Sequence, residues 1–261
     1  NVCQLKKAAD KVVCIFPWNQ RALQKEGLEA YFFGHPLLDI LEKEKKEKAR
    51  EKLSLQEAPT LGLLPGSREQ EIRYILPTLL QTASLLKNRL PTLQCVLAPP
   101  KGSLKFLADC LPKSWKISNN SLLNNGHKVY LRAGQSWGVI NASDALIVAS
   151  GTATLEAAIL GTPLIVVYKG SPLTHLEYHL RGLRFPYISL PNIILGRKEF
   201  PELIQEQAIP PLLARLAFQL LTDEKLRSKQ HRLFEEIKGI LGEKGTFKKT
   251  AILLKGMVKQ N

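Results

Sequence analysis

The stretch SDALIVASGTATLEAAILGTPLIVVY, residues 143–168, decides the fold expected for this chain. Its apolar runs at 145–150 and 163–168 have the length and the continuous hydrophobicity of buried strands. Between them, TATLEAAILG has the composition of a helix that stops at a glycine. A strand, a helix and a second strand with short joins are typical of a parallel sheet covered by helices on both faces.

The same alternation continues on both sides of this stretch. It predicts strands at 60–66, 93–100 and 127–131, and helices at 72–86, 102–111 and 136–143. Further on, 185–195 is expected to be extended, and three helices are expected near 210–221, 223–241 and 245–259. The sequence therefore predicts an α/β protein with a doubly wound parallel sheet of the Rossmann-like type.

Composition narrows the class of protein. The 261 residues include 37 Lys and Arg against 23 Asp and Glu, which gives a formal net charge of +14. Such a charge favours an anionic partner, although a generic basic protein without one is the plain alternative. Only 7% of residues are aromatic and no basic run is interleaved with them, so nucleic acid is not the expected partner. The four cysteines are scattered without a CxxC pair, which favours free thiols over a disulfide or zinc scaffold.

The first candidate site is LLPGSREQE, residues 63–71, where a strand turns into a helix. Gly66 and Ser67 let the backbone approach a ligand, and free N–H groups at a helix start favour an anion. Arg68 adds a permanent charge that can fork onto phosphate. The structural alternative is a tight turn in which Ser67 caps the helix.

The second candidate site lies inside the opening stretch. Ser150, Gly151 and Thr152 are small, so a ligand could lie against the backbone, and Thr154 adds a second hydroxyl. Glu156 is expected in the first helical turn, where its carboxylate could accept hydrogen bonds from a ribose diol. The alternative is an ordinary helix acid that balances the helix dipole.

Taken together, these segments resemble the lipid-A-disaccharide synthase family. LLPGSR, the 143–168 stretch, SLPNIILGRKEFPELIQE at 189–206 and GHPLLD at 34–39 occur in that family's order. The resemblance implies a GT-B glycosyltransferase with two Rossmann-like domains. It divides the chain into the end of an N-terminal acceptor domain (1–40), a linker helix (41–55), a UDP-sugar-binding domain (56–222) and C-terminal helices that pack back towards the first domain (223–261). The remainder of the N-terminal domain is expected to lie outside these residues.

The resemblance also implies a reaction, the inverting transfer of 2,3-diacylglucosamine from UDP to 2,3-diacylglucosamine 1-phosphate (lipid X). Arg68 and Asn192 are expected to take part in catalysis, with the general base in the N-terminal domain. No metal and no organic cofactor is implied. The residues expected to bind substrate are Gly66, Ser67, Arg68, Ser150, Gly151, Thr152, Thr154, Glu156, Asn192, Arg197 and Gln205, and the uracil-binding loop is expected near 132–138.

The implied partners are UDP-diacylglucosamine, lipid X and an anionic membrane surface, in a cytoplasmic homodimer peripheral to the inner membrane. The isolated chain is expected to bind nucleotide weakly and not to turn over. Two alternatives remain: another GT-B enzyme that uses UDP-N-acetylglucosamine, such as a 2-epimerase or a MurG-like transferase, and a non-catalytic relative that binds nucleotide or lipid. A metal site at HLEYH, 175–179, is not expected, because the acid does not directly follow the first histidine.

Overall fold

The computed structural model describes residues 2–170 and 186–258. The chain forms two compact units, one made of residues 1–42 and 234–261 and the other of residues 43–233. Every residue of the two candidate junctions belongs to the larger unit, so the fold of that unit positions the site.

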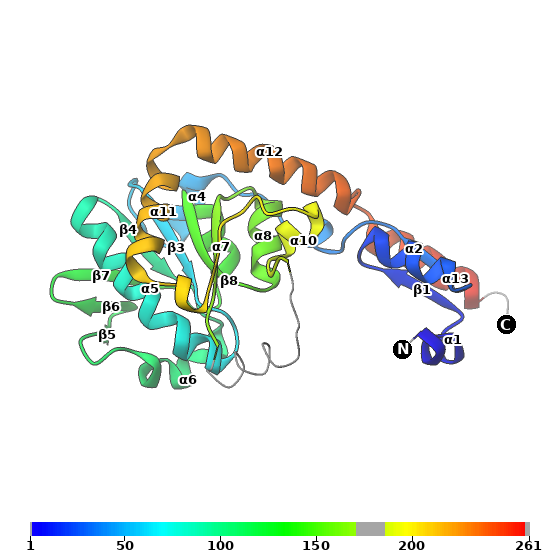
Figure 1. Ribbon diagram of the computed structural model, residues 1–261, viewed down its shortest axis with the longest axis horizontal. Helices are drawn as coiled ribbons and strands as arrows, with labels where there is room; N and C mark the ends of the chain where they lie inside the picture. Colours follow the sequence, from blue (N-terminus) through cyan, green and yellow to red (C-terminus); the bar gives the residue numbers. More distant parts are fainter. Residues whose placement is uncertain (1, 171–185, 259–261) are drawn as a thin grey trace. The chain divides into compact units, whose positions relative to one another are not determined.

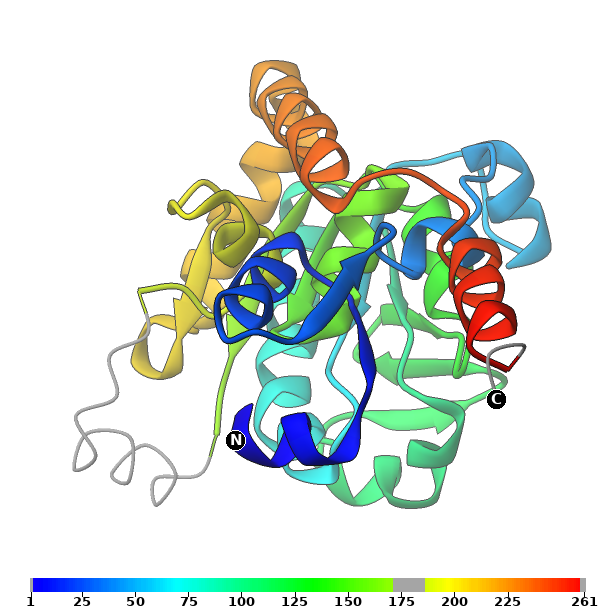
Figure 2. The same ribbon diagram turned by 90° about the vertical axis from the view of Figure 1, so that its right-hand side faces the viewer.

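The larger unit is built on a mostly parallel sheet. Its strand order is β10-β9-β8-β3-β4-β7-β6-β5, in which all pairs from β10 to β7 are parallel and the pairs β7–β6 and β6–β5 are antiparallel. Figures 1 and 2 show the chain in two views. The sequence did not predict β5, β6 or β10. The bounds are β3 Thr60–Leu64, β4 Gln94–Leu97, β5 Lys116–Ser118, β6 Ser121–Asn124, β7 His127–Leu131, β8 Ala145–Ala149, β9 Leu164–Tyr168 and β10 Glu202–Ile204.

Helices cover both faces of this sheet, as the sequence predicted. On one face, α5 (Glu69–Arg89) packs beside α11 (Pro210–Thr222). On the other, α4 (Lys46–Lys52) packs on α7 (Ser136–Ala142), and α7 lies beside α8 (Thr152–Leu160). The doubly wound fold class is therefore confirmed.

The side chains of β4 show how a strand serves two helical layers. Cys95 and Leu97 join the hydrophobic cluster of α5 and α11, whereas Val96 and Ala98 join the cluster of α4 and α7. Alternate residues of a strand point to opposite faces, so both sets must be apolar. On the neighbouring strand, Gly62 is needed because a Cβ there would lie 2.6 Å from Ser143 Oγ, at the end of α7.

The smaller unit contains a second parallel strand pair. β1 (Lys11–Cys14) and β2 (Glu29–Phe32) pair in parallel, with α2 (Pro17–Lys25) between them in sequence. The carboxylate of Asp39 accepts N–H bonds from Gly245 (2.5 Å) and Phe247 (3.0 Å), and these backbone bonds lower the pKa of Asp39. This contact ties the start of α13 to the segment after β2. The other helices are α1 Val2–Ala8, α3 Leu37–Ile40, the last part of α12 (Glu224–Leu241) and α13 Thr246–Val258.

Several sequence predictions are confirmed in detail. The strands expected at 60–66, 93–100, 127–131, 145–150 and 163–168 are β3, β4, β7, β8 and β9, and the three C-terminal helices are α11, α12 and α13. All four cysteines are free, and burial raises the pKa of the Cys95 thiol to about 12. That thiol is therefore protonated and unreactive at neutral pH.

Two element predictions were wrong. The helix expected at 102–111 is three short turns, Lys101–Ser103, Leu104–Leu107 and Ala108–Cys110, of which only the middle one is α-helical. The segment expected to be extended at 185–195 contains α10, Leu190–Leu195. Ser189 precedes that helix and its hydroxyl accepts the Asn192 N–H, so a serine cap and an early proline start the helix.

The charged helix expected as a linker at 41–55 also differs. It is shorter, at Lys46–Lys52, and it belongs to the larger unit. Arg50 explains why: its side chain is only 8% exposed, and it donates to the Ala142 carbonyl and to Asp144. One face of α4 is therefore anchored rather than solvated.

Candidate functional site

The two junctions follow neighbouring strands. β8 pairs with β3, and the chain passes from β3 to β4 on one side of β3 and later returns to β8 on the other. In open α/β sheets, ligands bind at such a switch point, beyond the carboxyl ends of the strands. Residues 66–68 follow β3 and residues 150–156 follow β8, so the topology brings both junctions to this position.

A pocket of about 460 Å³ occupies this edge of the sheet. It lies beyond the ends of β3, β4 and β8 and at the starts of α5, α7 and α8. The residues that line it are Leu64, Gly66, Ser67, Arg68, Glu71, Ala98, Pro99, Pro100, Gly134, Ser136, Ala149, Ser150, Gly151, Thr152, Ala153 and Glu156. Seven of the residues expected to bind substrate therefore share one pocket, namely Gly66, Ser67, Arg68, Ser150, Gly151, Thr152 and Glu156.

The first junction is already engaged by an acid. Glu71 Oε2 accepts the N–H groups of Ser67 (2.9 Å) and Arg68 (3.2 Å), and Glu71 Oε1 lies 3.3 Å from Arg68 Nη1. Arg68, rather than Ser67, is the residue that precedes α5. The sequence argument treated these N–H groups as free for a phosphate, and in this structure a carboxylate of the same chain holds two of them.

The second junction has open backbone donors. α8 begins at Thr152, with Gly151 before it in an extended conformation and without a side-chain cap. Helix geometry leaves the first N–H groups, including those of Thr152 and Ala153, without partners inside the helix, and both residues line the pocket. Thr154 does not line it, because its buried hydroxyl donates to the Gly151 carbonyl at 2.7 Å. Thr154 therefore shapes the start of α8 rather than facing the pocket.

Glu156 lies at the pocket edge, half-buried. It is the fifth residue of α8 and not in the first turn, so the expectation on this point was wrong and the helix dipole is a weaker explanation for it. Burial raises the pKa of its carboxyl, although a hydrogen bond from the Trp137 indole N–H acts in the opposite direction. Among the described residues, no cation is recorded as stabilising this carboxylate, and a half-buried acid in such a setting is typical of a functional position.

The side chain of Asn192 has a structural role and does not face the pocket. It is fully buried: Oδ1 accepts the N–H groups of Glu199 and Phe200 (both 2.9 Å), and Nδ2 donates to the Phe200 carbonyl (3.0 Å) and to Glu202 Oε1 (2.9 Å). These four bonds use the whole capacity of the amide. The side chain fixes the turn between α10 and β10, so a direct catalytic contact for Asn192 does not fit this structure.

Arg197 and Gln205 also lie outside the pocket lining. Arg197 is 45% exposed in its side chain and pairs with Glu199 at 3.0 Å. Gln205 has a positive φ of 50°, and its Oε1 accepts the Gly170 N–H at 3.3 Å. Of the second junction's residues, Ser150 connects to this region, because its hydroxyl donates to the Ile188 carbonyl at 2.7 Å.

Sequence reasoning missed several lining residues. Pro99 and Pro100 follow β4 directly, so the rule that ligands lie beyond strand ends would have found them. Gly134 and Ser136 belong to the 132–138 loop in which the base-binding segment was expected. Glu71 sits four residues after Ser67, and the spacing of a helix-capping acid was the available signal.

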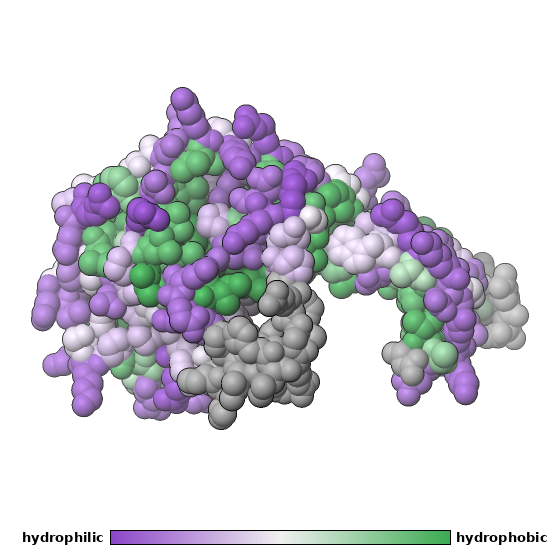
Figure 3. Space-filling model, viewed as in Figure 1, coloured by the Kyte–Doolittle hydropathy of each residue, from purple (hydrophilic) through white to green (hydrophobic). Residues whose placement is uncertain are grey.

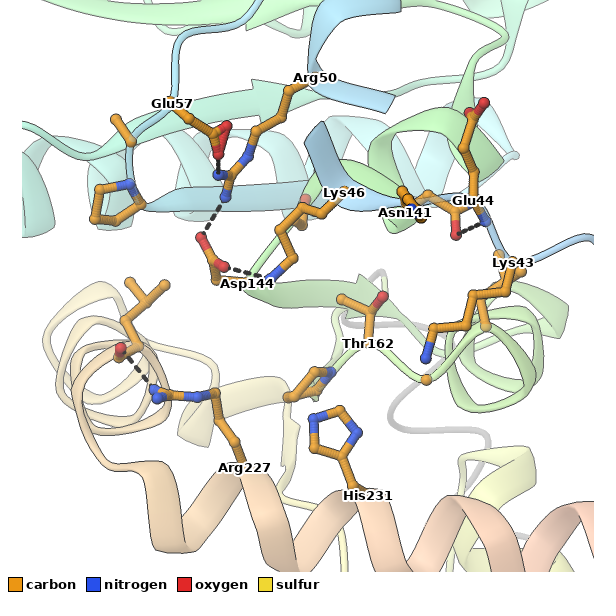
Figure 4. A pocket seen from close by; sticks show the side chains of 18 residues that line it. Lys43, Glu44, Lys46, Arg50, Glu57, Asn141, Asp144, Thr162, Arg227 and His231 are labelled. Atoms are coloured by element: carbon orange, nitrogen blue, oxygen red, sulfur yellow. Dashed lines mark hydrogen bonds and ion pairs between the residues drawn. The ribbon is translucent and has the colours of Figure 1, made fainter. Parts of the chain in front are cut away.

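A larger pocket of about 680 Å³ lies at the opposite edge of the sheet and contains no expected site residue (Figure 4). Its cations face the ends of helices: Arg50 donates to the last residue of α7, and Arg227 donates to Leu220 and Leu221 near the end of α11. Asp144 is bonded by Lys46 and Arg50. Helix carboxyl ends favour positive charge, so these residues stabilise the fold.

A third pocket, of about 610 Å³, has four cations and no acid among the described residues that line it, namely Lys52, Lys101, Lys128 and Arg132. Most of these cations are engaged. Arg132 donates to the Leu53 carbonyl at 2.6 and 2.8 Å, Lys128 lies 4.4 Å from the Tyr130 ring centre, and Lys52 pairs with Glu44. The pocket at the switch point is therefore the best supported site.

In residues 2–170 and 186–258, no cluster of three or more His, Cys, Asp and Glu side chains is arranged to hold a metal ion. No helix in that part of the chain is long and apolar enough to cross a membrane. The HLEYH segment, with His175 and His179, lies outside the described residues.

The fold and the site define a class: a Rossmann-like domain of the GT-B glycosyltransferase type, with its pocket at the switch point. Among solved structures, the chain is similar to S. aureus MnaA in a structure with UDP (TM-score 0.60, 13% identity, 96% of this chain and 61% of that one). It is also similar to the wall teichoic acid polymerase TagF (TM-score 0.58, 14% identity, all of this chain and 61% of that one). At these identities the likeness shows the fold alone.

Sequence comparison gives the family. The model of the lipid-A-disaccharide synthetase family matches residues 1–255. The lipid-A-disaccharide synthase of Synechocystis is 34% identical over 95% of this chain, and that of Neisseria meningitidis serogroup A is 38% identical over 78%. The chain belongs to the lipid-A-disaccharide synthetase family. It spans 62% and 52% of the length of these two relatives.

Proposed function

We propose that this chain is the nucleotide-sugar-binding part of a lipid-A-disaccharide synthase. The reaction is the inverting transfer of 2,3-diacylglucosamine from UDP to 2,3-diacylglucosamine 1-phosphate, with release of UDP. The observation that carries the proposal is the pocket at the switch point, in which Arg68 and the start of α8 meet Glu156. The family membership supports the same substrate class.

The roles of the residues follow from their chemistry. Arg68 and the N–H groups at the start of α8 stabilise the negative charge that develops on the departing diphosphate. Glu156 accepts hydrogen bonds from the ribose diol, which fixes the nucleotide before transfer. The small side chains of Gly151 and Thr152 leave the phosphates room to approach the backbone.

Calorimetric titration of UDP tests this proposal. Arg68→Ala and Glu156→Ala should each weaken binding by about tenfold or more, because each removes a charged hydrogen-bonding partner. Arg73→Ala is the matched control, since Arg73 lies one turn further along α5, pairs with Glu69 and does not line the pocket. Binding that none of the three substitutions changes would place the nucleotide elsewhere.

A transferase assay separates this proposal from a non-catalytic relative. The chain alone is expected to bind UDP weakly and to transfer no sugar. Measurable formation of the disaccharide 1-phosphate by these 261 residues would contradict that expectation. The same assay with UDP-N-acetylglucosamine tests the epimerase and MurG-like alternatives.

A further inference from the structure

The switch-point pocket already holds an anion of its own. Glu71 is the third residue of α5, and its side chain is only 18% exposed although it lines the pocket. One of its oxygens accepts two backbone N–H groups, those of Ser67 and Arg68, and the other lies beside the Arg68 guanidinium. Two adjacent backbone donors and a guanidinium are the groups that bind a phosphate at a strand-to-helix turn.

The backbone at Gly66 is shaped around this carboxylate. Gly66 has a φ of +99°, and a Cβ there would lie 2.5 Å from Glu71 Oε2. Any larger residue would collide with the acid as well as adopt an unfavourable backbone conformation. The turn is therefore complementary to a compact anionic group seated on the 67–68 amides.

The charges of the pocket indicate that the position of the Glu71 carboxylate affects the binding of a diphosphate. Among the described residues, the pocket's ionisable lining side chains are one cation, Arg68, and two acids, Glu71 and Glu156. A diphosphate that entered beside both acids would meet more negative than positive charge, and like charges within a few ångströms repel. If the Glu71 side chain rotates out, the Arg68 charge and the 67–68 amides are released together.

We propose that Glu71 is a built-in competitor for phosphate: its carboxylate occupies the phosphate donors of the empty pocket, and a phosphorylated ligand binds to these donors by displacing it. For a nucleotide ligand this rests on the proposed function. A phosphate oxygen then takes the Ser67 and Arg68 N–H groups, and the Glu71 side chain moves to solvent by rotation about its own bonds. A neutral nucleoside has no group for this exchange, so Glu71 lowers the affinity of the pocket for phosphorylated ligands and leaves its affinity for a neutral nucleoside unchanged.

The test uses Glu71→Gln with Glu69→Gln as the matched control. Glutamine keeps an oxygen that accepts the two N–H groups, so the turn is preserved while the competing charge is removed. Glu69 starts the same helix, pairs with Arg73 at 2.8 Å and does not line the pocket, so its variant removes the same charge outside the site. UDP, uridine and inorganic pyrophosphate are titrated into all three proteins by calorimetry, with melting temperatures recorded beside them.

Glu71→Gln should bind UDP and pyrophosphate at least about fivefold more tightly than the unsubstituted chain, because a like charge has left the donors. Uridine binding should not change, and Glu69→Gln should match the unsubstituted chain. Weaker or unchanged binding of both phosphorylated ligands by Glu71→Gln would overturn the proposal and leave Glu71 as a helix cap alone. The same holds if no protein binds pyrophosphate at millimolar concentration. If pyrophosphate binds more tightly to Glu71→Gln while UDP binds to none, the inference about Glu71 stands and the nucleotide function fails.

Discussion

At the scale of single residues, Glu156 and Asn192 were both expected to bind substrate, but their side chains have different surroundings. Glu156 is half-buried with a Trp137 hydrogen bond as its recorded partner, and burial raises the pKa of its carboxyl. Asn192 is fully buried with four partners from its own chain. Burial of Glu156 destabilises its ionised form, and its carboxylate can still accept a hydrogen bond from a ligand. The amide of Asn192 has no donor or acceptor left for a ligand.

Glu156→Gln should therefore raise stability while it lowers UDP affinity. Because the pKa is raised in the folded state, the folded chain binds this proton more tightly than the unfolded chain, and stability falls as pH rises from the ordinary carboxyl range through the raised pKa. Glutamine cannot ionise, so the variant lacks this fall. Melting temperatures of the two proteins should be close at acid pH and diverge in favour of the variant towards neutral pH. Parallel profiles would contradict the assigned environment of Glu156.

Asn192→Ala should be strongly destabilising, because it leaves the buried Glu199 and Phe200 N–H groups without their acceptor and removes one of the donors to the Glu202 carboxylate. The expected loss is about 3 kcal/mol in urea denaturation. Asn192→Asp should be at least as damaging, since it sets a carboxylate against that of Glu202. Arg197→Ala, at an exposed position, should stay within about 0.5 kcal/mol. An Asn192→Ala protein with unchanged stability and lost UDP binding would restore a direct ligand role.

At the scale of elements, the sequence predicted most of the parallel strands and missed the short strands β5, β6 and β10. β3, β4, β8 and β9 are buried and largely apolar, and such runs identify buried parallel strands. β5 and β6 are short and meet at Asn119 and Asn120, both with positive φ, and β6 meets β7 at Asn125 and Gly126, also with positive φ. Such residue pairs are typical of two-residue hairpin turns, so the sequence did contain a signal for these strands.

The position of the site could be predicted from the sequence, but the side-chain contacts within it could not. The rule for strand ends placed residues 66–68 and 150–156 at one edge of the sheet, because both segments follow parallel strands. Which donors are already occupied depends on side-chain conformation, and the Glu71 carboxylate on the 67–68 amides could not be inferred from spacing alone. Asn192 and Thr154 were expected to bind substrate, but both are buried. Their burial could not be predicted, because it depends on neighbours in space that the motif does not include.

The anchoring of α4 gives a prediction at this scale. Arg50 and Lys46 both bond Asp144, but the Arg50 side chain is 8% exposed and that of Lys46 is 40% exposed. Arg50→Ala should cost about 3 kcal/mol, because it takes the donor from the Ala142 carbonyl and removes a buried guanidinium from a partly buried acid, which keeps Lys46 and the Thr60 N–H. Lys46→Ala should cost less than about 1 kcal/mol, since exposed ion pairs contribute little. Equal costs in urea denaturation would mean that α4 is held by its apolar face alone.

At the scale of the whole molecule, the chain has a net charge of +14, whereas the described residues that line the pocket at the switch point include two acids beside one arginine. Most of the positive charge of the described residues therefore lies outside the lining of this pocket. Hydrophilic residues cover much of the face of the larger unit seen in Figure 3. On α13, Phe247, Ile252 and Leu254 are each more than half exposed, next to Lys248, Lys249 and Lys255. Basic side chains beside exposed apolar ones favour the surface of an anionic membrane.

The chain should accordingly sediment with vesicles that contain phosphatidylglycerol and not with vesicles of phosphatidylcholine alone. Binding should fall steeply between about 50 and 300 mM salt. Over this range the screening length decreases from more than the length of a lysine side chain to less than that length, so the attraction between lysine and lipid weakens. Replacing Lys248 and Lys249 with glutamate should weaken binding by about 1 kcal/mol or more per residue if α13 faces the lipid. Replacing Lys105 and Lys116 of the larger unit in the same way is the matched control for net charge alone. Salt-independent binding to both kinds of vesicle would instead mean that the exposed apolar residues, and not the charge, drive the association.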